Sequence, residues 1–231
     1  IPFEHLESGV EQKIRGLEAA FRAHIFGQDQ VLPVLNRTVE VALMNLADPR
    51  RPRGRMFLLG PPGPGKPESA RLLAQYLMGG ESALLRFDMS DYQEASAVST
   101  LLGSDKGLVG SEEGGRLTEP LREDPHRIVL FDEIEKAHPH IFNLFLQILD
   151  NGEIRDKRGL LVSFRHALIL FTSNAGCSAE QGLTGATRAE IVKRLGAVFR
   201  PEFLNRIEDF VPFAALDRKA RRRVAILQLE R

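Results

Sequence analysis

The chain is poor in cysteine, which excludes stabilisation by internal disulfide bonds. Its 231 residues include a single cysteine, Cys177. A lone cysteine is typical of proteins from reducing compartments, and we expect a cytoplasmic location. No residue near Cys177 in the sequence marks a partner that would activate its thiol, so a cysteine nucleophile is not expected.

Net charge is absent as well. Lys and Arg number 31, Asp and Glu number 31, and the formal net charge at pH 7 is +0. Global charge therefore favours neither nucleic acid nor an anionic membrane as a partner. No apolar run approaches the roughly 20 residues of a membrane span. The acidic residues Glu4, Glu7 and Glu11 interrupt any signal-peptide pattern, and because the chain does not begin with Met we expect it to be part of a longer protein.

The clearest motif that is present is the turn Gly60-Pro-Pro-Gly-Pro-Gly-Lys66. It lies between an apolar run at 56–59 and a helical pattern at 69–76, which is the setting of a phosphate-binding loop. The backbone N–H groups of such a turn and the positive end of the helix attract phosphate, and the lysine reaches the outer phosphates. The usual motif continues with Ser or Thr, whose hydroxyl ligates Mg²⁺. Here that residue is Pro67, so the motif predicts nucleotide binding but puts hydrolysis in question.

Two acids follow the apolar run at 128–131. Asp132 and Glu133 are expected at the carboxyl end of a buried strand, where ligands of α/β proteins bind. In proteins with a phosphate-binding loop the first acid helps to hold Mg²⁺, and the second can act as a general base towards water. Alone, such a run is often only a strand that meets solvent, but its place after a phosphate loop favours the functional interpretation.

Two further polar residues are candidates. Asn174 belongs to the polar segment 172–174 that follows the apolar run at 169–171, and it could orient a water near the γ-phosphate, although a turn-favouring Asn is the alternative. Arg206 could contact a phosphate in trans, although a solvated helix charge is the alternative. His138 and His140 have no third ligand at a suitable spacing, so no metal is expected other than Mg²⁺ with a nucleotide.

Apolar runs and helical patterns alternate along the chain. Strands are predicted at 55–59, 83–87, 128–131 and 167–171. Helices are predicted at 5–23, 28–46, 66–79, 94–102, 140–149, 187–198 and 217–231. This alternation predicts a three-layer α/β fold around a parallel sheet.

The motifs also occur in the order of one family. After the phosphate loop come the segments 86–92, 110–115, 131–139, 172–176 and 199–207. From residue 1 to residue 231 the chain resembles the second AAA+ ATPase module of ClpB-type protein disaggregases. The resemblance implies an AAA+ large α/β nucleotide-binding subdomain at 1–212, followed at 213–231 by the first helix of a truncated small helical subdomain.

The resemblance also implies roles for single residues. Ile25 and Phe26 would pack on adenine. Asp132 would bind Mg²⁺, Glu133 would be the catalytic base, Asn174 the γ-phosphate sensor, and Arg206 a finger that reaches a neighbouring subunit. The remaining ATP-binding residues would be those of the loop and the first turn of its helix: Pro61, Pro62, Gly63, Pro64, Gly65, Lys66, Pro67 and Glu68. Family members are homo-hexameric rings that thread unfolded or aggregated polypeptide through a central pore.

The chain departs from the family at several positions. Its expected pore loop reads Gly107-Leu108-Val109-Gly110, with Leu108 in place of an aromatic residue, and Pro67 replaces the hydroxyl residue. Residues 93–95 also resemble ClpV-type motors of type VI secretion. Two functions therefore stay open: a motor that hydrolyses ATP, and a nucleotide-binding but hydrolytically weak module for assembly or regulation. We expect the isolated chain to be monomeric.

Overall fold

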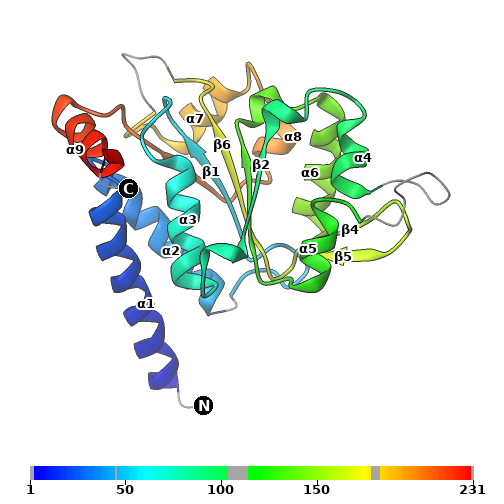
Figure 1. The fold of residues 1–231 in the computed structure, drawn as a ribbon, viewed down its shortest axis with the longest axis horizontal. Helices are drawn as coiled ribbons and strands as arrows, with labels where there is room; N and C mark the ends of the chain where they lie inside the picture. The colour runs from blue at the N-terminus through cyan, green and yellow to red at the C-terminus, as the bar shows by residue number, and fades with distance from the viewer. Residues whose placement is uncertain (1–2, 45, 104–113, 178–182, 230–231) are drawn as a thin grey trace.

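A parallel sheet forms the centre of the molecule. The computed structural model describes residues 3–44, 46–103, 114–177 and 183–229 (Figure 1). Five parallel strands occur in the order β2-β3-β6-β1-β7. Their bounds are β1 Gly54–Leu59, β2 Leu84–Asp88, β3 Ile128–Asp132, β6 Leu168–Ser173 and β7 Asp209–Pro212. The predicted α/β fold with a parallel sheet is confirmed.

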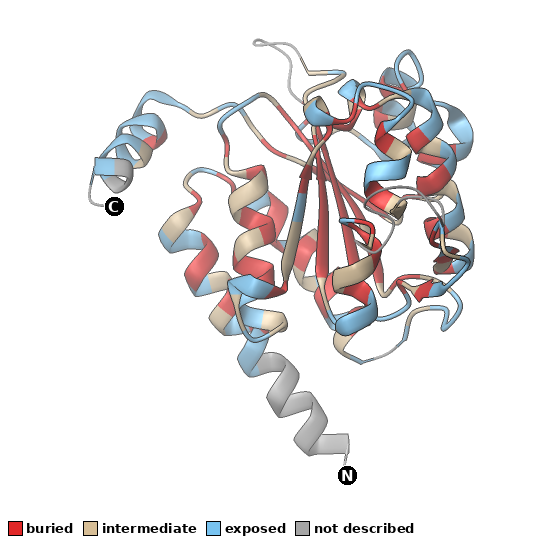
Figure 2. Ribbon diagram, turned by 45° about the vertical axis from the view of Figure 1, so that its right-hand side comes forward, coloured by how far each residue is buried: buried red, intermediate tan, exposed pale blue. Residues whose placement is uncertain are grey.

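Helices cover both faces of this sheet (Figure 1). One face packs against α1 Phe3–His24, α2 Leu32–Leu43 and α3 Lys66–Leu77. The other face packs against α4 Ala97–Leu102, α5 Thr118–Glu123, α6 Pro139–Asn151, α7 Arg188–Leu195 and α8 Pro201–Leu204. Successive residues of a strand point to opposite faces. Accordingly Met56 and Leu58 belong to the first apolar cluster, and Phe57 and Leu59 belong to the second. The central strands β1, β3 and β6 are therefore buried from both sides, whereas the edge strand β2 is largely not (Figure 2).

Smaller elements complete the chain. A two-stranded antiparallel hairpin joins β4 Glu153–Arg155 to β5 Leu161–Ser163. Single turns of 3-10 helix are η1 Asp29–Val31, η2 Glu81–Ala83, η3 Met89–Asp91 and η4 Ile134–Lys136, and the last helix is α9 Arg218–Leu229. Among the described helices, none combines the length and apolar character needed to cross a bilayer.

Most predicted elements are confirmed with small shifts at their ends. The predicted helix 28–46 is divided into η1 and the shorter α2, in which Pro33 occupies the first turn and needs no N–H partner. The sequence did not predict β7, α5, α8 or the hairpin, which are all short.

The segment that follows the sheet is fixed by one buried side chain. Gln28 donates from Nε2 to the carbonyl of Ala214 at 2.9 Å, and its Oε1 accepts from the N–H of Ala214 at 2.8 Å. These two bonds tie the chain after β7 to the turn after α1. The domain boundary expected between residues 212 and 213 stays a prediction.

Candidate nucleotide site

The topology brings three loops to the same edge of the sheet. Because the strands are parallel, the carboxyl ends of β1, β3 and β6 meet there. β1 leads into the phosphate loop, β3 ends at Asp132, and β6 is followed directly by Asn174. Lys66, Asp132 and Asn174 are thus brought to the same edge by elements far apart in the chain.

Glycines give the phosphate loop its shape. Gly60, Gly63 and Gly65 have φ values of 151°, 90° and 100°, which residues other than glycine rarely adopt. A Cβ on Gly60 would lie 2.7 Å from the carbonyl oxygen of Phe213, so this turn also needs the close backbone approach that only glycine permits. A Cβ on Gly65 would lie 3.3 Å from Cγ2 of Ile25. Ile25 therefore borders the loop, and its expected contact with adenine stays a prediction.

Lys66 is buried at the start of α3. Its ammonium group donates to the carbonyls of Gly60 at 2.5 Å and Pro61 at 3.0 Å, and to Oδ1 of Asn174 at 2.8 Å. Burial lowers the pKa of this lysine. The carbonyls and the amide are neutral acceptors, and a phosphate oxygen would be a stronger, charge-assisted partner for the same ammonium group.

Glu133 is linked to Lys66 through Asn174. Nδ2 of Asn174 donates to Oε1 of Glu133 at 3.1 Å, and the ammonium of Lys136 lies 2.5 Å from Oε2 of Glu133. The hydrogen bond from Lys136 holds the pKa of Glu133 below its usual range, so the carboxylate is ionised, as a general base must be. Lys136 was not predicted. Its only sequence signal is the spacing of three residues from Glu133, which suits a helical ion pair.

The backbone of Glu133 is in a rare conformation. Its φ of 54° is the one positive value among the non-glycine residues that the structure describes. Such a conformation costs about 1–3 kcal/mol and persists where neighbouring contacts enforce it. The N–H of Glu133 donates to Oγ1 of Thr172 at 2.9 Å, and the N–H of Asn174 donates to Oε1 of Glu135 at 2.9 Å. These bonds between adjacent strand ends fix the base in place, and the sequence assigned no role to Thr172 or Glu135.

Asp132 is buried and both of its carboxylate oxygens are engaged. Oδ1 accepts from Oγ1 of Thr172 at 2.5 Å, and Oδ2 accepts from Nη2 of Arg86 at 2.6 Å. Pro67 offers no hydroxyl, and the hydroxyl of Ser69 donates to the carbonyl of Gly65 at 2.9 Å. Asp132, Pro67 and Ser69 therefore do not provide the several free oxygen ligands that a tightly held Mg²⁺ needs. No cluster of three or more His, Cys, Asp or Glu is placed to hold a metal in the described parts of the chain.

Other predicted residues lie around this centre. The guanidinium of Arg223, on α9, lies 5.6 Å from the centroid of the Phe26 ring, so α9 approaches the side expected to hold adenine. Glu68 pairs with Arg71 at 2.5 Å, one turn along α3. The expected pore-loop residues Gly107, Leu108, Val109 and Gly110 lie outside the described residues.

Cys177 follows Asn174 closely in the chain and is half-buried. Burial raises the pKa of its thiol, which favours the protonated form.

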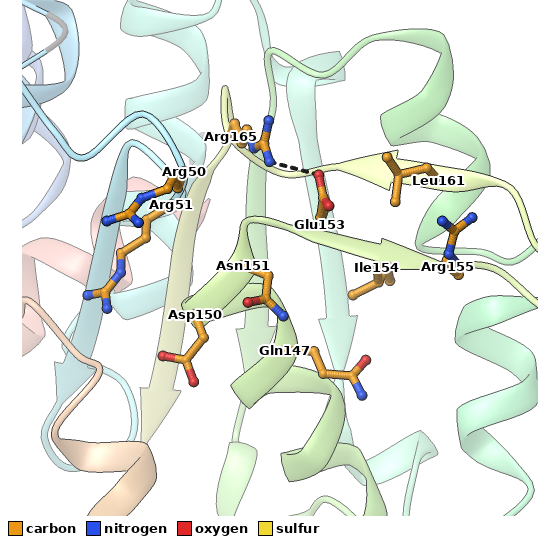
Figure 3. Close-up of a pocket in the computed structure, with 10 residues that line it drawn as sticks. All are labelled: Arg50, Arg51, Gln147, Asp150, Asn151, Glu153, Ile154, Arg155, Leu161 and Arg165. Atoms are coloured by element: carbon orange, nitrogen blue, oxygen red, sulfur yellow. Dashed lines mark hydrogen bonds and ion pairs between the residues drawn. The ribbon is translucent and has the colours of Figure 1, made fainter.

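Arg206 does not join the other site residues. Its Nε lies 2.6 Å from Oδ2 of Asp150, and its Nη1 donates to the carbonyl of Glu202 at 2.5 Å. Asp150, near the end of α6, lines an open hollow of about 620 Å³ together with Arg50 and Arg51, which precede β1 (Figure 3). This hollow is therefore at the amino-terminal edge of the sheet, opposite the phosphate loop. A role of Arg206 towards a neighbouring molecule stays a prediction.

Comparison with known proteins gives a consistent picture. Residues 51–210 match the family model described as AAA domain (Cdc48 subfamily). The whole chain is 42% identical to chaperone protein ClpB 2 of a Nostoc species, where it covers 27% of that protein's length. It is 41% identical to chaperone protein ClpB2, chloroplastic, of Oryza sativa, covering 25% of that protein, and 40% identical to the probable chaperone protein ClpB 1 of Chlorobaculum tepidum, covering 56%.

The chain thus spans about a quarter of the length of most of these relatives. The match to the family model runs from just before β1 into β7, and it includes the phosphate loop, the two acids at the end of β3 and Asn174. The chain belongs to the AAA domain family and is a homologue of the ClpB chaperones.

Proposed function

We propose that this chain is the ATP-binding motor module of a ClpB-type unfoldase or disaggregase, corresponding to the second ATPase module of that family. The observation that carries the proposal is the contact series Lys66–Asn174–Glu133, which joins the phosphate loop, the expected sensor and the expected base. A site that only bound a nucleotide would not need an ionised carboxylate at Glu133 that is linked through Asn174 to the phosphate-binding Lys66.

In the proposed reaction Lys66 and the loop N–H groups bind the outer phosphates of ATP. Asn174 orients a water molecule, and Glu133 accepts one of its protons. A carboxylate has about four lone-pair sites, so Glu133 can receive this proton while Asn174 and Lys136 still donate hydrogen bonds to its carboxylate. The water oxygen bonds to the γ-phosphorus, the bond from that phosphorus to the bridging oxygen breaks, and ADP and phosphate leave.

The wider setting of this reaction rests on the family. We propose a homo-hexameric ring, in the cytoplasm, in which Arg206 reaches the nucleotide of a neighbouring copy. The ring would thread unfolded or aggregated polypeptide past the loop that contains Leu108. Mg²⁺ accompanies ATP in this class of reaction, and Asp132 is the residue that the family would use to hold it. In this chain Thr172 and Arg86 already engage both carboxylate oxygens of Asp132, so the residues present do not fit a tightly held metal.

Replacement of the base tests the proposal. Glu133→Gln should keep ATP affinity within about 2-fold and lower phosphate release at least ~10²-fold, because the amide cannot accept the proton. The matched control is Glu123→Gln, an exposed carboxylate at the end of α5. Turnover that is the same in native protein and in Glu133→Gln would contradict the proposal.

One observation favours the second candidate, a weakly hydrolysing module for assembly or regulation. Pro67 supplies neither a hydroxyl nor a backbone N–H to the phosphates, although proline is sterically acceptable in a first helical turn. We expect turnover at least ~10²-fold below that of Pro67→Thr, or about 2.7 kcal/mol of barrier. The assay is phosphate release with excess ATP and Mg²⁺ at protein concentrations where rings form. Equal rates for the native chain and Pro67→Thr would show that the hydroxyl is dispensable and would favour an ordinary motor.

A further inference from the structure

We propose that this chain binds ATP with almost no contribution from a divalent cation. The inference rests on the proposed function, because it takes ATP binding at the phosphate loop as given and specifies the form in which the nucleotide binds. Two independent observations carry it. One is the residue at position 67, and the other is the state of Asp132.

Position 67 lies in the first turn of α3, where a hydroxyl would face the metal bound to the outer phosphates. Proline has no hydroxyl, and its nitrogen carries no hydrogen. Ser69 cannot substitute for it, since two residues along a helix turn the side chain by ~200°. Ser69 is also fully buried, with its hydroxyl donated to the carbonyl of Gly65. The carboxylate of Glu68, also in the first turn, pairs with Arg71. The helix therefore offers no hydroxyl ligand at this end of the site.

Asp132 is the other protein group expected to serve a metal, and its negative charge is already balanced by an ion pair with Arg86. Arg86, on the neighbouring strand β2, donates to one carboxylate oxygen, and Thr172, on β6, donates to the other. The side chain of Asp132 is 7% exposed, whereas that of Arg86 is 51% exposed. A buried carboxylate with a bound guanidinium has little to gain by exchanging it for a hydrated cation.

The hydrogen bond from Thr172 to Asp132 is also difficult to break. The hydroxyl oxygen of Thr172 accepts the N–H of Glu133, whose backbone has the positive φ of 54°. Breaking the Thr172 contact would disturb the backbone of the expected base. A metal could therefore reach Asp132 only by displacing Arg86, and no hydroxyl from α3 would compensate for that loss.

The groups that do face the phosphates need no metal. Lys66 carries the positive charge of the loop, and the helix N-terminus adds favourable potential. We therefore expect ATP to bind through this lysine and the loop backbone alike in the presence and absence of magnesium.

The test is isothermal titration calorimetry of ATP into the chain, with excess Mg²⁺ or with EDTA. For the native chain the two dissociation constants should agree within ~3-fold. Pro67→Thr should bind at least ~10-fold more tightly with Mg²⁺ than with EDTA, because the hydroxyl is restored. Pro67→Ala is the matched control, since it restores the N–H without the hydroxyl, and it should remain insensitive to Mg²⁺.

A second variant tests the role of Arg86. Arg86→Gln removes the guanidinium charge that balances the Asp132 carboxylate. In the Pro67→Thr background it should therefore increase the preference for Mg²⁺ further. Circular dichroism and thermal unfolding identify any variant that is not folded, and Pro67→Thr alone still decides the matter if Arg86→Gln unfolds.

Two results would overturn the inference. One is a native chain that binds ATP more than ~10-fold better with Mg²⁺ than with EDTA. The other is a Mg²⁺ preference in Pro67→Ala equal to that in Pro67→Thr. Failure of the native chain to bind ATP under either condition would instead refute the proposed function, on which the inference depends.

Discussion

Glu133 is held at both carboxylate oxygens, by Asn174 on one side and by Lys136 on the other. Lys136 also donates to the hydroxyl of Ser90 at 3.2 Å, which fixes its ammonium group between η3 and η4. The ionised form of the expected base is thus stabilised by a lysine to which the sequence analysis assigned no role.

Loss of this lysine should change the acidity of the base. The Lys136 ammonium stabilises the ionised form of Glu133 and so lowers its pKa. Lys136→Met should therefore raise the Glu133 pKa towards its ordinary value, as measured by carbon NMR of the side-chain carboxyl during a pH titration. Lys193→Met, at an exposed position of α7, is the control and should leave it unchanged. An unaltered Glu133 pKa in Lys136→Met would show that the pair does not form in solution.

A second residue-scale prediction concerns Lys66. Burial lowers its pKa in the free protein, and the phosphates of a bound nucleotide would raise it. Binding is then coupled to proton uptake, so ATP affinity should fall as the pH rises through the lowered pKa of free Lys66. Calorimetry between about pH 7 and 10 measures this loss. Lys66→Arg does not titrate in that range, and an equally steep loss in that variant would argue against Lys66 as the cause.

At this scale the sequence predicted the residues that end apolar runs or complete a local motif. Lys66, Glu133 and Asn174 are of this kind, and the structure brings them together. The roles of Arg86 and Thr172 could not be predicted, because they arise only when β2, β3 and β6 lie side by side. No spacing within a single segment carries that information.

Among the elements, the phosphate loop depends on its glycines to different degrees. Gly60 combines a φ of 151° with a Cβ position only 2.7 Å from the carbonyl oxygen of Phe213, whereas a Cβ on Gly63 would meet nothing within 4 Å. Gly60→Ala should therefore lower the free energy of unfolding by about 2–4 kcal/mol, and Gly63→Ala by about 1 kcal/mol, through backbone strain alone. Chemical denaturation measures both. Equal losses would mean that the approach of Phe213 to the loop is not maintained.

Long and strongly patterned elements were the ones that the sequence predicted. The buried strand β3 and the helix α6 appear within two residues of their predicted ends. The strand β7 was missed because it has four residues, ends in Pro212 and, within the described part of the chain, pairs with no strand other than the distant β1. The hairpin of β4 and β5 was missed because each strand has three residues and no clear alternation.

For the whole molecule, alternation of strands and helices predicted the three layers, but it could not give the strand order. That order places β6 between β1 and β3, and so puts Asn174 between the phosphate loop and Glu133. The position of Arg206, bound to Asp150 at the opposite edge, likewise follows from packing of α8 against α6 and not from any local pattern.

The surface of the described residues bears on association. Among the described residues the exposed large apolar side chains occur singly or in pairs on different parts of the chain: Met44 and Leu46 after α2, Tyr76 on α3, Leu160 and Leu161 in the hairpin, Val198 after α7, and Ile226 and Leu229 on α9. Scattered apolar residues do not form the continuous patch that a stable interface buries. We expect the isolated chain to sediment as a monomer at micromolar concentration without nucleotide. A stable hexamer under those conditions would contradict this expectation.

The central claim is that the turn from Gly60 to Lys66 binds the phosphates of ATP. Calorimetric titration of ATP into the native chain and into Lys66→Ala tests it most directly, with Lys219→Ala, at an exposed position of α9, as the control. Loss of the charge-assisted contact should weaken binding by about 1.5–3 kcal/mol in Lys66→Ala and leave the control unchanged. Equal ATP affinity in the native chain and Lys66→Ala would show that the nucleotide does not bind at this loop.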